Sequence, residues 1–86
     1  MTVHAYVLIE ADQTRVQEIK ETLPEIELDG SRVVKVEVVT GPFDLIATVE
    51  STNIGQLGRR VSEGIAAAGG VRRTLTCLVI DDQTET

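Results

Sequence analysis

The sequence predicts an α+β sandwich in which a four-stranded antiparallel sheet carries two helices on one face. Four segments alternate apolar and polar residues with period two, which is typical of strands, and two segments repeat apolar residues every three or four positions, which is typical of helices. Their order along the chain is βαββαβ. Because crossovers of this kind are right-handed, both helices fall on the same side of the sheet. This arrangement is the ferredoxin-like fold.

The first half of the chain supplies a strand, a helix and a second strand. After a strand over residues 3–9, Asp12 is a suitable N-cap, and apolar residues at helical spacing follow it. Pro24 ends this helix, because the residue before a proline avoids the helical conformation. Residues 33–40 are β-branched almost throughout and predict the second strand.

The second half begins with a tight turn at Gly41 and Pro42, which joins the second strand to a third over residues 43–50 as a hairpin. A capping signal at Asn53 then opens a helix that ends at Gly69. Residues 71–80 predict the last strand and residues 81–86 a polar tail. A chain of 86 residues holds only one core, so we expect a single domain over residues 1–80.

Composition excludes several classes of protein. The formal net charge of −6 repels phosphate backbones, so we expect no direct binding to nucleic acid. Cys77 is the only cysteine, which excludes an intrachain disulfide and fits a reducing cytoplasm. The start of the chain has neither a basic region nor a long apolar run, so we expect no signal peptide and no membrane span.

The alternation in the strands also predicts which residues lie on each face of the sheet. The helices are expected to cover Ala5, Val7, Ile9, Val34, Val36, Val38, Leu45, Ala47, Val49, Leu75, Cys77 and Val79.

The other face is expected to present His4, Tyr6, Leu8, Val33, Val39, Ile46, Thr48, Thr76, Leu78 and Ile80. That face is too apolar for an isolated antiparallel sheet, and large exposed apolar patches mark interfaces. We therefore expect a two-fold dimer that buries it; the alternative is a sheet with scattered exposed aliphatic residues. The side chains predicted at this dimer interface are Tyr6, Leu8, Val39, Ile46, Leu78 and Ile80.

Residues for catalysis or metal binding are sparse. His4 is the only histidine, and the carboxylates are spread along predicted surface faces. No glycine-rich phosphate loop opens a helix. The sequence therefore predicts no enzyme activity, no metal site and no cofactor.

One short segment, the join between the second and third strands, suggests a binding role. Gly41 allows a ligand to approach the backbone closely, and its N–H can donate to a carboxylate. The Asp44 carboxylate can accept from an ammonium group, so the segment offers partners for both ends of an amino acid. The alternative is an ordinary hairpin turn with Asp44 in water.

The run VVTGPFDLIATVE resembles the effector-binding domain of the Lrp/AsnC transcriptional regulators, in which a strand ends in Thr-Gly, followed by a variable residue, an aromatic residue and Asp. The last strand, VRRTLTCLVI, is similar to the closing strand of that domain. Phe43 stands where Tyr is common, and Pro42 removes one backbone N–H. The resemblance implies a ligand site that includes Thr40, Gly41, Phe43, Asp44, Thr74 and Thr76.

The resemblance also implies dimers that build octamers or rings, with an amino-acid effector bound near subunit interfaces. Typical members carry a helix-turn-helix domain before this one, whereas this sequence starts at the first strand. We therefore expect a stand-alone cytoplasmic module that binds an amino-acid-like ligand and modulates transcription by assembling with full-length regulators. Two other hypotheses remain: a structural oligomer without a ligand, and a small dimeric ferredoxin-like enzyme.

Overall fold

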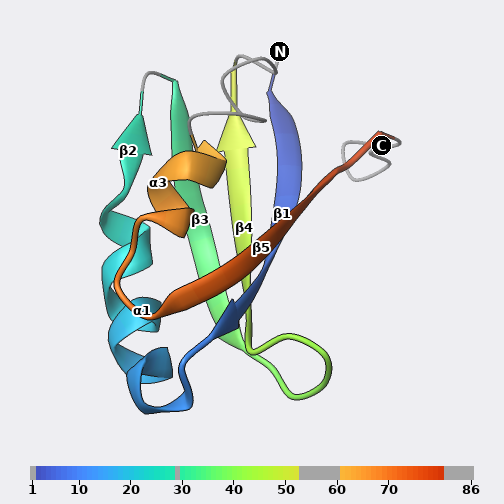
Figure 1. The fold of residues 1–86 in the computed structure, drawn as a ribbon. Helices are drawn as coiled ribbons and strands as arrows, with labels where there is room; N and C mark the ends of the chain where they lie inside the picture. The colour runs from blue at the N-terminus through green and yellow to red at the C-terminus, as the bar shows by residue number, and fades with distance from the viewer. Residues whose placement is uncertain (1, 29, 53–60, 81–86) are drawn as a thin grey trace.

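One antiparallel sheet in the strand order β2-β3-β4-β1-β5 forms the frame of the protein. The computed structural model describes residues 2–28, 30–52 and 61–80 (Figure 1). The elements are β1 (Val3–Ala11), a 3₁₀ turn (Gln13–Arg15), α1 (Val16–Thr22), a second 3₁₀ turn (Leu23–Glu25), β2 (Glu27–Leu28), β3 (Ser31–Val38), β4 (Leu45–Ser51), α3 (Ser62–Ala66) and β5 (Val71–Leu78).

The predicted ferredoxin-like architecture is confirmed. The first and third of the four long strands, β1 and β4, lie at the centre of the sheet, and α1 and α3 cover one face (Figure 1). The two-residue β2 adds a short edge strand that the sequence pattern did not predict. It pairs with the start of β3 around Gly30, which has φ 77°.

The first helix begins and ends where the sequence places its signals. The side chain of Asp12 accepts a hydrogen bond from the Thr14 backbone N–H, as expected of an N-cap. The helical backbone starts as a 3₁₀ turn, continues as α1, and returns to a 3₁₀ turn that contains Pro24. Of the second predicted helix, the described residues are those from Val61 onward, and α3 ends at Ala66, a few residues before the predicted end at Gly69; the capping signal at Asn53 lies outside the described residues.

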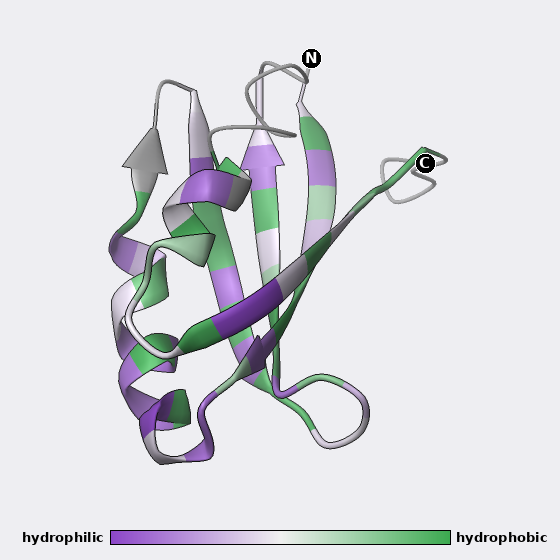
Figure 2. Cartoon of the chain, in the orientation of Figure 1, coloured by the Kyte–Doolittle hydropathy of each residue, from purple (hydrophilic) through white to green (hydrophobic). Residues whose placement is uncertain are grey.

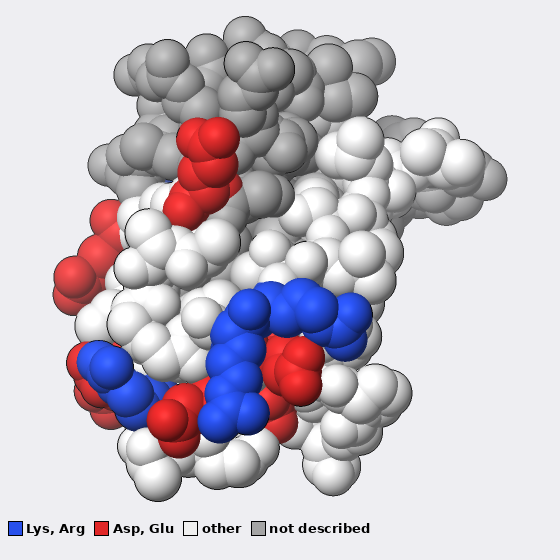
Figure 3. All heavy atoms as spheres, viewed as in Figure 1, with Lys and Arg blue, Asp and Glu red and all other residues white. Residues whose placement is uncertain are grey.

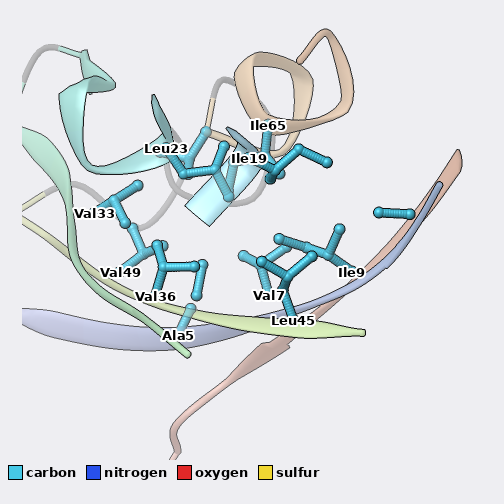
Figure 4. Packing of buried hydrophobic residues seen from close by; sticks show 13 residues of the cluster. Ala5, Val7, Ile9, Ile19, Leu23, Val33, Val36, Leu45, Val49 and Ile65 are labelled. Carbon is cyan, nitrogen blue, oxygen red and sulfur yellow. The ribbon is translucent and has the colours of Figure 1, made fainter. Parts of the chain in front are cut away.

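The hydrophobic core fills the space between the two helices and the sheet. Ile19 and Leu23 from the first helical segment and Ile65 from α3 point down onto strand side chains such as Val7 and Leu45 (Figure 4). Burying each aliphatic side chain of this size contributes about 1.5–3 kcal/mol. Alternating hydrophobic and hydrophilic bands on β1 and β4 (Figure 2) reflect the predicted period of two.

The prediction for β3 was wrong at its first valines. The pairing with β4 shifts between Val33 and Lys35, so Val34 is the extra residue of a β-bulge. Val33 is therefore buried under the helices, whereas Val34 is 47% exposed. Val36 is buried as expected, and Val38, although it pairs with Leu45, is 48% exposed at the end of the strand.

The face assignment of β5 was also wrong. Thr76 pairs with Val7 and Leu78 pairs with Ala5, so these two residues lie on the helix side of the sheet. Leu75 and Cys77 pair with Leu8 and Tyr6 on the opposite side and are exposed. The side on which a strand's residues lie depends on its register with its neighbour, and alternation within β5 alone does not fix this register.

The join between β3 and β4 is longer than the predicted two-residue turn. β3 ends at Val38 and β4 begins at Leu45, so residues 39–44 form a loop (Figure 1). Phe43 belongs to this loop and not to the apolar face of β4. No helix in the described part of the chain is long and apolar enough to cross a lipid bilayer.

Candidate functional site

Backbone hydrogen bonds hold the loop of residues 39–44 at its base. The Val39 N–H donates to the Asp44 carbonyl at 2.9 Å, which closes the loop, and the Asp44 N–H donates to the Ile9 carbonyl at 2.8 Å. Thr40 and Gly41 are exposed between these anchors. Gly41 has φ 143°, a conformation that L side chains rarely adopt, and an added Cβ would meet no atom within 4 Å.

The Asp44 carboxylate is the polar centre of the site. Its Oδ2 accepts a hydrogen bond from the backbone N–H of Ala11 at 2.8 Å, and its Oδ1 accepts from the side-chain amide of Gln13 at 2.6 Å. Ala11 lies at the end of β1 and Gln13 in the turn that follows it. The pairing of β1 with β4 places this segment beside the loop. Asp44 therefore ties the loop to the start of the first helical segment.

Phe43 lies beside a charged pair. The guanidinium carbon of Arg73 is 5.2 Å from the centre of the Phe43 ring, within the range of a cation–π contact. Arg73 Nε donates to Glu10 Oε1 at 3.0 Å, across the β1–β5 pairing. We call Glu10, Gln13, Phe43, Asp44 and Arg73 the loop cluster.

The loop cluster has mixed charge at the protein surface. Figure 3 shows acidic and basic side chains interleaved over the start of β5 and the adjoining turn before α1. Next to the cluster, hydrogen bonds from the Thr14 backbone and hydroxyl hold the pKa of Asp12 below its usual value, and the positive charge of Arg72 acts in the same direction. Carboxylates and a guanidinium at one surface site suit a ligand that carries both charges.

The structure separates the predicted ligand-binding residues into two groups. Phe43 and Asp44 lie together in the loop cluster, and Thr40 and Gly41 lie on the same loop. Thr74 and Thr76 are half-buried on β5, where they pair with Ile9 and Val7 on the helix side of the sheet. Arg73, between them and the loop, faces the other side with Glu10.

Sequence reasoning missed Glu10, Gln13 and Arg73. The opposite charges of Glu10 and Arg73 could have indicated an ion pair only if the β1–β5 register had been known, because these residues are far apart in the chain. Nothing local in the sequence marks Gln13, since its contact with Asp44 arises from the tertiary fold.

A second candidate site is the face of the sheet opposite the helices. Its centre is apolar, and we define it as the open face, formed by Tyr6, Leu8, Ile46, Leu75 and Cys77. Tyr6 and Leu75 are 45% and 50% exposed.

Ion pairs flank the open face on both sides. Arg32–Glu50 and Lys35–Glu37 lie toward β3, and Arg73–Glu10 lies toward β5. Of the other residues predicted at a dimer interface, Val39 is half-buried in the loop, Leu78 lies on the helix side, and Ile80 is 95% exposed beyond the end of β5.

Within the described ranges, no group of three or more histidine, cysteine or carboxylate side chains is placed to hold a metal ion. His4 lies at the far end of β1 from Ile9, whose carbonyl contacts Asp44, a separation of about 16 Å along the strand. His4 and Asp44 therefore do not share one site.

The chain matches the model of one protein family. The profile of the Lrp/AsnC ligand binding domain matches residues 4–86. The solved structure of TTHA0845 from Thermus thermophilus is 36% identical, with a TM-score of 0.79, and the match covers 93% of this chain and 95% of that one. No curated protein matches the chain.

Two similar structures are longer proteins. Escherichia coli AsnC is 16% identical with a TM-score of 0.76, and the match covers 94% of this chain and 52% of that one. The transcriptional regulator NMB0573 from Neisseria meningitidis, solved as a complex with L-Met, is 13% identical with a TM-score of 0.73, and the match covers 94% and 51%. At these identities the likeness shows the shared fold. The chain spans about half the length of both proteins.

Proposed function

Since this chain belongs to the Lrp/AsnC ligand-binding-domain family, we propose that it is a self-assembling module that binds an amino-acid-like ligand at the loop cluster. The mixed charge around the anchored loop of residues 39–44 carries this proposal, because an amino acid presents an ammonium and a carboxylate together. The L-Met bound to the Neisseria regulator is a ligand of the same chemical class.

In this proposal the ammonium of the ligand lies at Asp44 Oδ1, which faces the exposed side chain of Gln13. The carboxylate lies toward the Arg73 guanidinium or the Gly41 N–H; among the described residues, none accepts a hydrogen bond from that N–H. Thr40, Thr74 and Thr76 stay predicted contacts, although the two β5 threonines face the helix side of the sheet, opposite to Glu10 and Arg73. Phe43 supplies an apolar wall that lacks the hydroxyl of a tyrosine.

The open face supports the proposal of self-assembly. Five apolar or weakly polar side chains lie together with charged pairs around them, which is the usual pattern of an interface core and its rim. A two-fold dimer buries the same patch on both subunits. Leu75 and Cys77 enter this proposed interface together with the predicted Tyr6, Leu8 and Ile46, and rings of dimers are the larger assemblies that the family implies.

Regulation follows from linkage between binding and assembly. A ligand that binds one assembly more tightly than another shifts the population toward it. At a concentration 100-fold above its dissociation constant, such a ligand stabilises the favoured state by about 2.7 kcal/mol. Co-assembly with full-length regulators of the family would carry this change to transcription without direct contact between this chain and DNA, which agrees with its net charge of −6.

The test is isothermal titration of the purified protein with each of the twenty amino acids, in parallel for wild type and Asp44→Asn. Asparagine keeps an oxygen that can accept from Ala11 but removes the charge that the ammonium needs. We expect binding of a few amino acids that Asp44→Asn weakens at least about 10-fold, since charged hydrogen bonds contribute about 1.5–3 kcal/mol. Asp12→Asn is the matched control, because Asp12 caps the neighbouring turn and its carboxylate accepts hydrogen bonds from Thr14.

Two outcomes would change the conclusion. Absence of binding by every amino acid, with the oligomer intact, would leave a structural assembly module. Binding that Asp44→Asn and Asp12→Asn weaken equally would move the ligand away from the loop cluster.

A further inference from the structure

The two oxygens of the Asp44 carboxylate have partners of different kinds. Oδ2 accepts from the backbone N–H of Ala11, which is buried at the end of β1. Oδ1 accepts from the side-chain amide of Gln13, which is exposed. The first partner cannot leave without a change in the backbone, whereas the second leaves by rotation of one side chain.

The backbone at Gln13 is held independently of this contact. Asp12 Oδ1 accepts from both the N–H and the hydroxyl of Thr14, and the Arg15 N–H donates to the Asp12 carbonyl. The turn of residues 12–15 therefore keeps its shape when the Gln13 amide moves away. This arrangement makes the contact between Gln13 and Asp44 exchangeable.

We propose that the Gln13 amide occupies the position of the ligand's ammonium group and that the ligand must displace it. This inference rests on the proposed function and names the selectivity of that same site. The amide is a neutral donor, and an ammonium forms a charge-assisted hydrogen bond that is about twice as strong. An amino acid gains by the exchange, whereas an N-acetylated amino acid, which offers only another neutral amide, gains nothing. Gln13 thus competes with every ligand for Asp44 Oδ1, so that only a group that bonds more strongly than a neutral amide, such as a free ammonium, gains by binding there.

The experiment compares four proteins, wild type, Gln13→Ala, Gln13→Lys and Gln17→Ala, by titration with the best-binding amino acid and with its N-acetyl derivative. Gln17 is the matched control, since it is an exposed glutamine one turn further along, on α1. We expect Gln13→Ala to bind the amino acid about 2- to 10-fold more tightly, because the net contribution of a hydrogen bond is about 0.5–1.5 kcal/mol. The same variant should gain affinity for the N-acetyl derivative, and Gln13→Lys should lose affinity for both because its own ammonium pairs with Asp44.

A second readout does not depend on affinity. In wild type, the side-chain amide NMR signal of Gln13 should move on addition of the amino acid while that of Gln17 stays in place. Binding by wild type that Gln13→Ala leaves unchanged or weakens would overturn the inference and leave the proposed function intact. Binding by neither wild type nor Gln13→Ala would overturn both. Binding by Gln13→Ala alone would support the competition between the Gln13 amide and the ligand, but it would overturn the proposed function for the wild-type protein.

Discussion

Asp44 Oδ2 and the backbone nitrogen of Ala11 lie 2.8 Å apart and join two segments that are 33 positions apart in the sequence. This hydrogen bond gives Asp44 a structural role that is separate from any ligand. Since Ala11 is only 4% exposed, water is a poor substitute for Asp44 as the partner of its N–H.

We expect Asp44→Ala to destabilise the fold even without ligand. An unsatisfied buried donor costs about 1–3 kcal/mol, and each 1 kcal/mol lowers the melting temperature of a domain of this size by about 4–8 °C. Asp44→Asn should lose clearly less stability than Asp44→Ala, because its side-chain oxygen can still accept a hydrogen bond from the Ala11 N–H. Thermal denaturation of both variants checks this, and equal losses for the two would contradict the anchoring role.

Three glycines should respond differently to alanine. Gly70 has φ 95°, and an added Cβ would lie 2.9 Å from the Arg15 Cβ, so Gly70→Ala combines backbone strain with a collision. Gly41 has a positive φ but open space around it, so Gly41→Ala should cost only the strain, about 1–3 kcal/mol. A Cβ added at Gly69 would meet the movable end of the Arg15 side chain, so Gly69→Ala should lose the least stability.

Chemical denaturation of the three variants measures their free energies of unfolding, and we expect Gly70→Ala to be the least stable. A loss at Gly41 as large as that at Gly70 would show that the contact with Arg15 contributes little. Arg15→Ala combined with Gly69→Ala should recover the loss seen in Gly69→Ala alone, because it removes the guanidinium that the new methyl group meets.

A charge in the open face should disrupt self-assembly. We expect Leu75→Asp to convert the proposed dimer to monomers, because it places a carboxylate next to Leu8 within the apolar open face. Val38→Asp is the matched control, since Val38 is 48% exposed, close to the 50% of Leu75, but pairs with Leu45 on the helix side. Light scattering after size-exclusion chromatography measures the mass of each variant. If Val38→Asp dissociates and Leu75→Asp does not, the interface does not lie on the open face.

Acid should weaken the start of the first helical segment. Hydrogen bonds from Thr14 lower the pKa of Asp12 from 3.8, and the hydrogen bond and charge of Arg15 lower the pKa of Glu18 from 4.5. For a carboxylate whose pKa is lower in the folded state, the stabilisation is fully present above the unfolded pKa. It is lost as the pH falls through the folded pKa, because protonation then favours the unfolded chain.

Urea midpoints measured from neutral pH down through these values should therefore fall once the pH drops below about 4.5. Asp12→Asn should show a smaller fall than wild type, since asparagine caps the turn without titrating. An equal fall in both proteins would assign the acid sensitivity to other carboxylates.

The element order and the helix signals could be read from the sequence because they are local. Period-two alternation predicted β1 and β4 and their buried residues Ala5, Val7, Leu45 and Ala47, which the structure confirms. Asp12 and Pro24 act at the boundaries of the first helical segment within a few residues of their own positions. Together with the right-handed crossover rule, these local signals were enough to predict the fold.

Only the tertiary structure decided the face of the outer strands and the environment of Asp44. The bulge at Val34 and the register of β5 against β1 each depend on which residues meet across the sheet, and a shift of one residue exchanges its two faces. Asp44, Ala11 and Gln13 meet because β1 and β4 pair as neighbours. The sequence by itself determined which segments form strands and helices, whereas contacts between distant segments determined which side chains share a site, because such contacts exist only once the whole sheet is assembled.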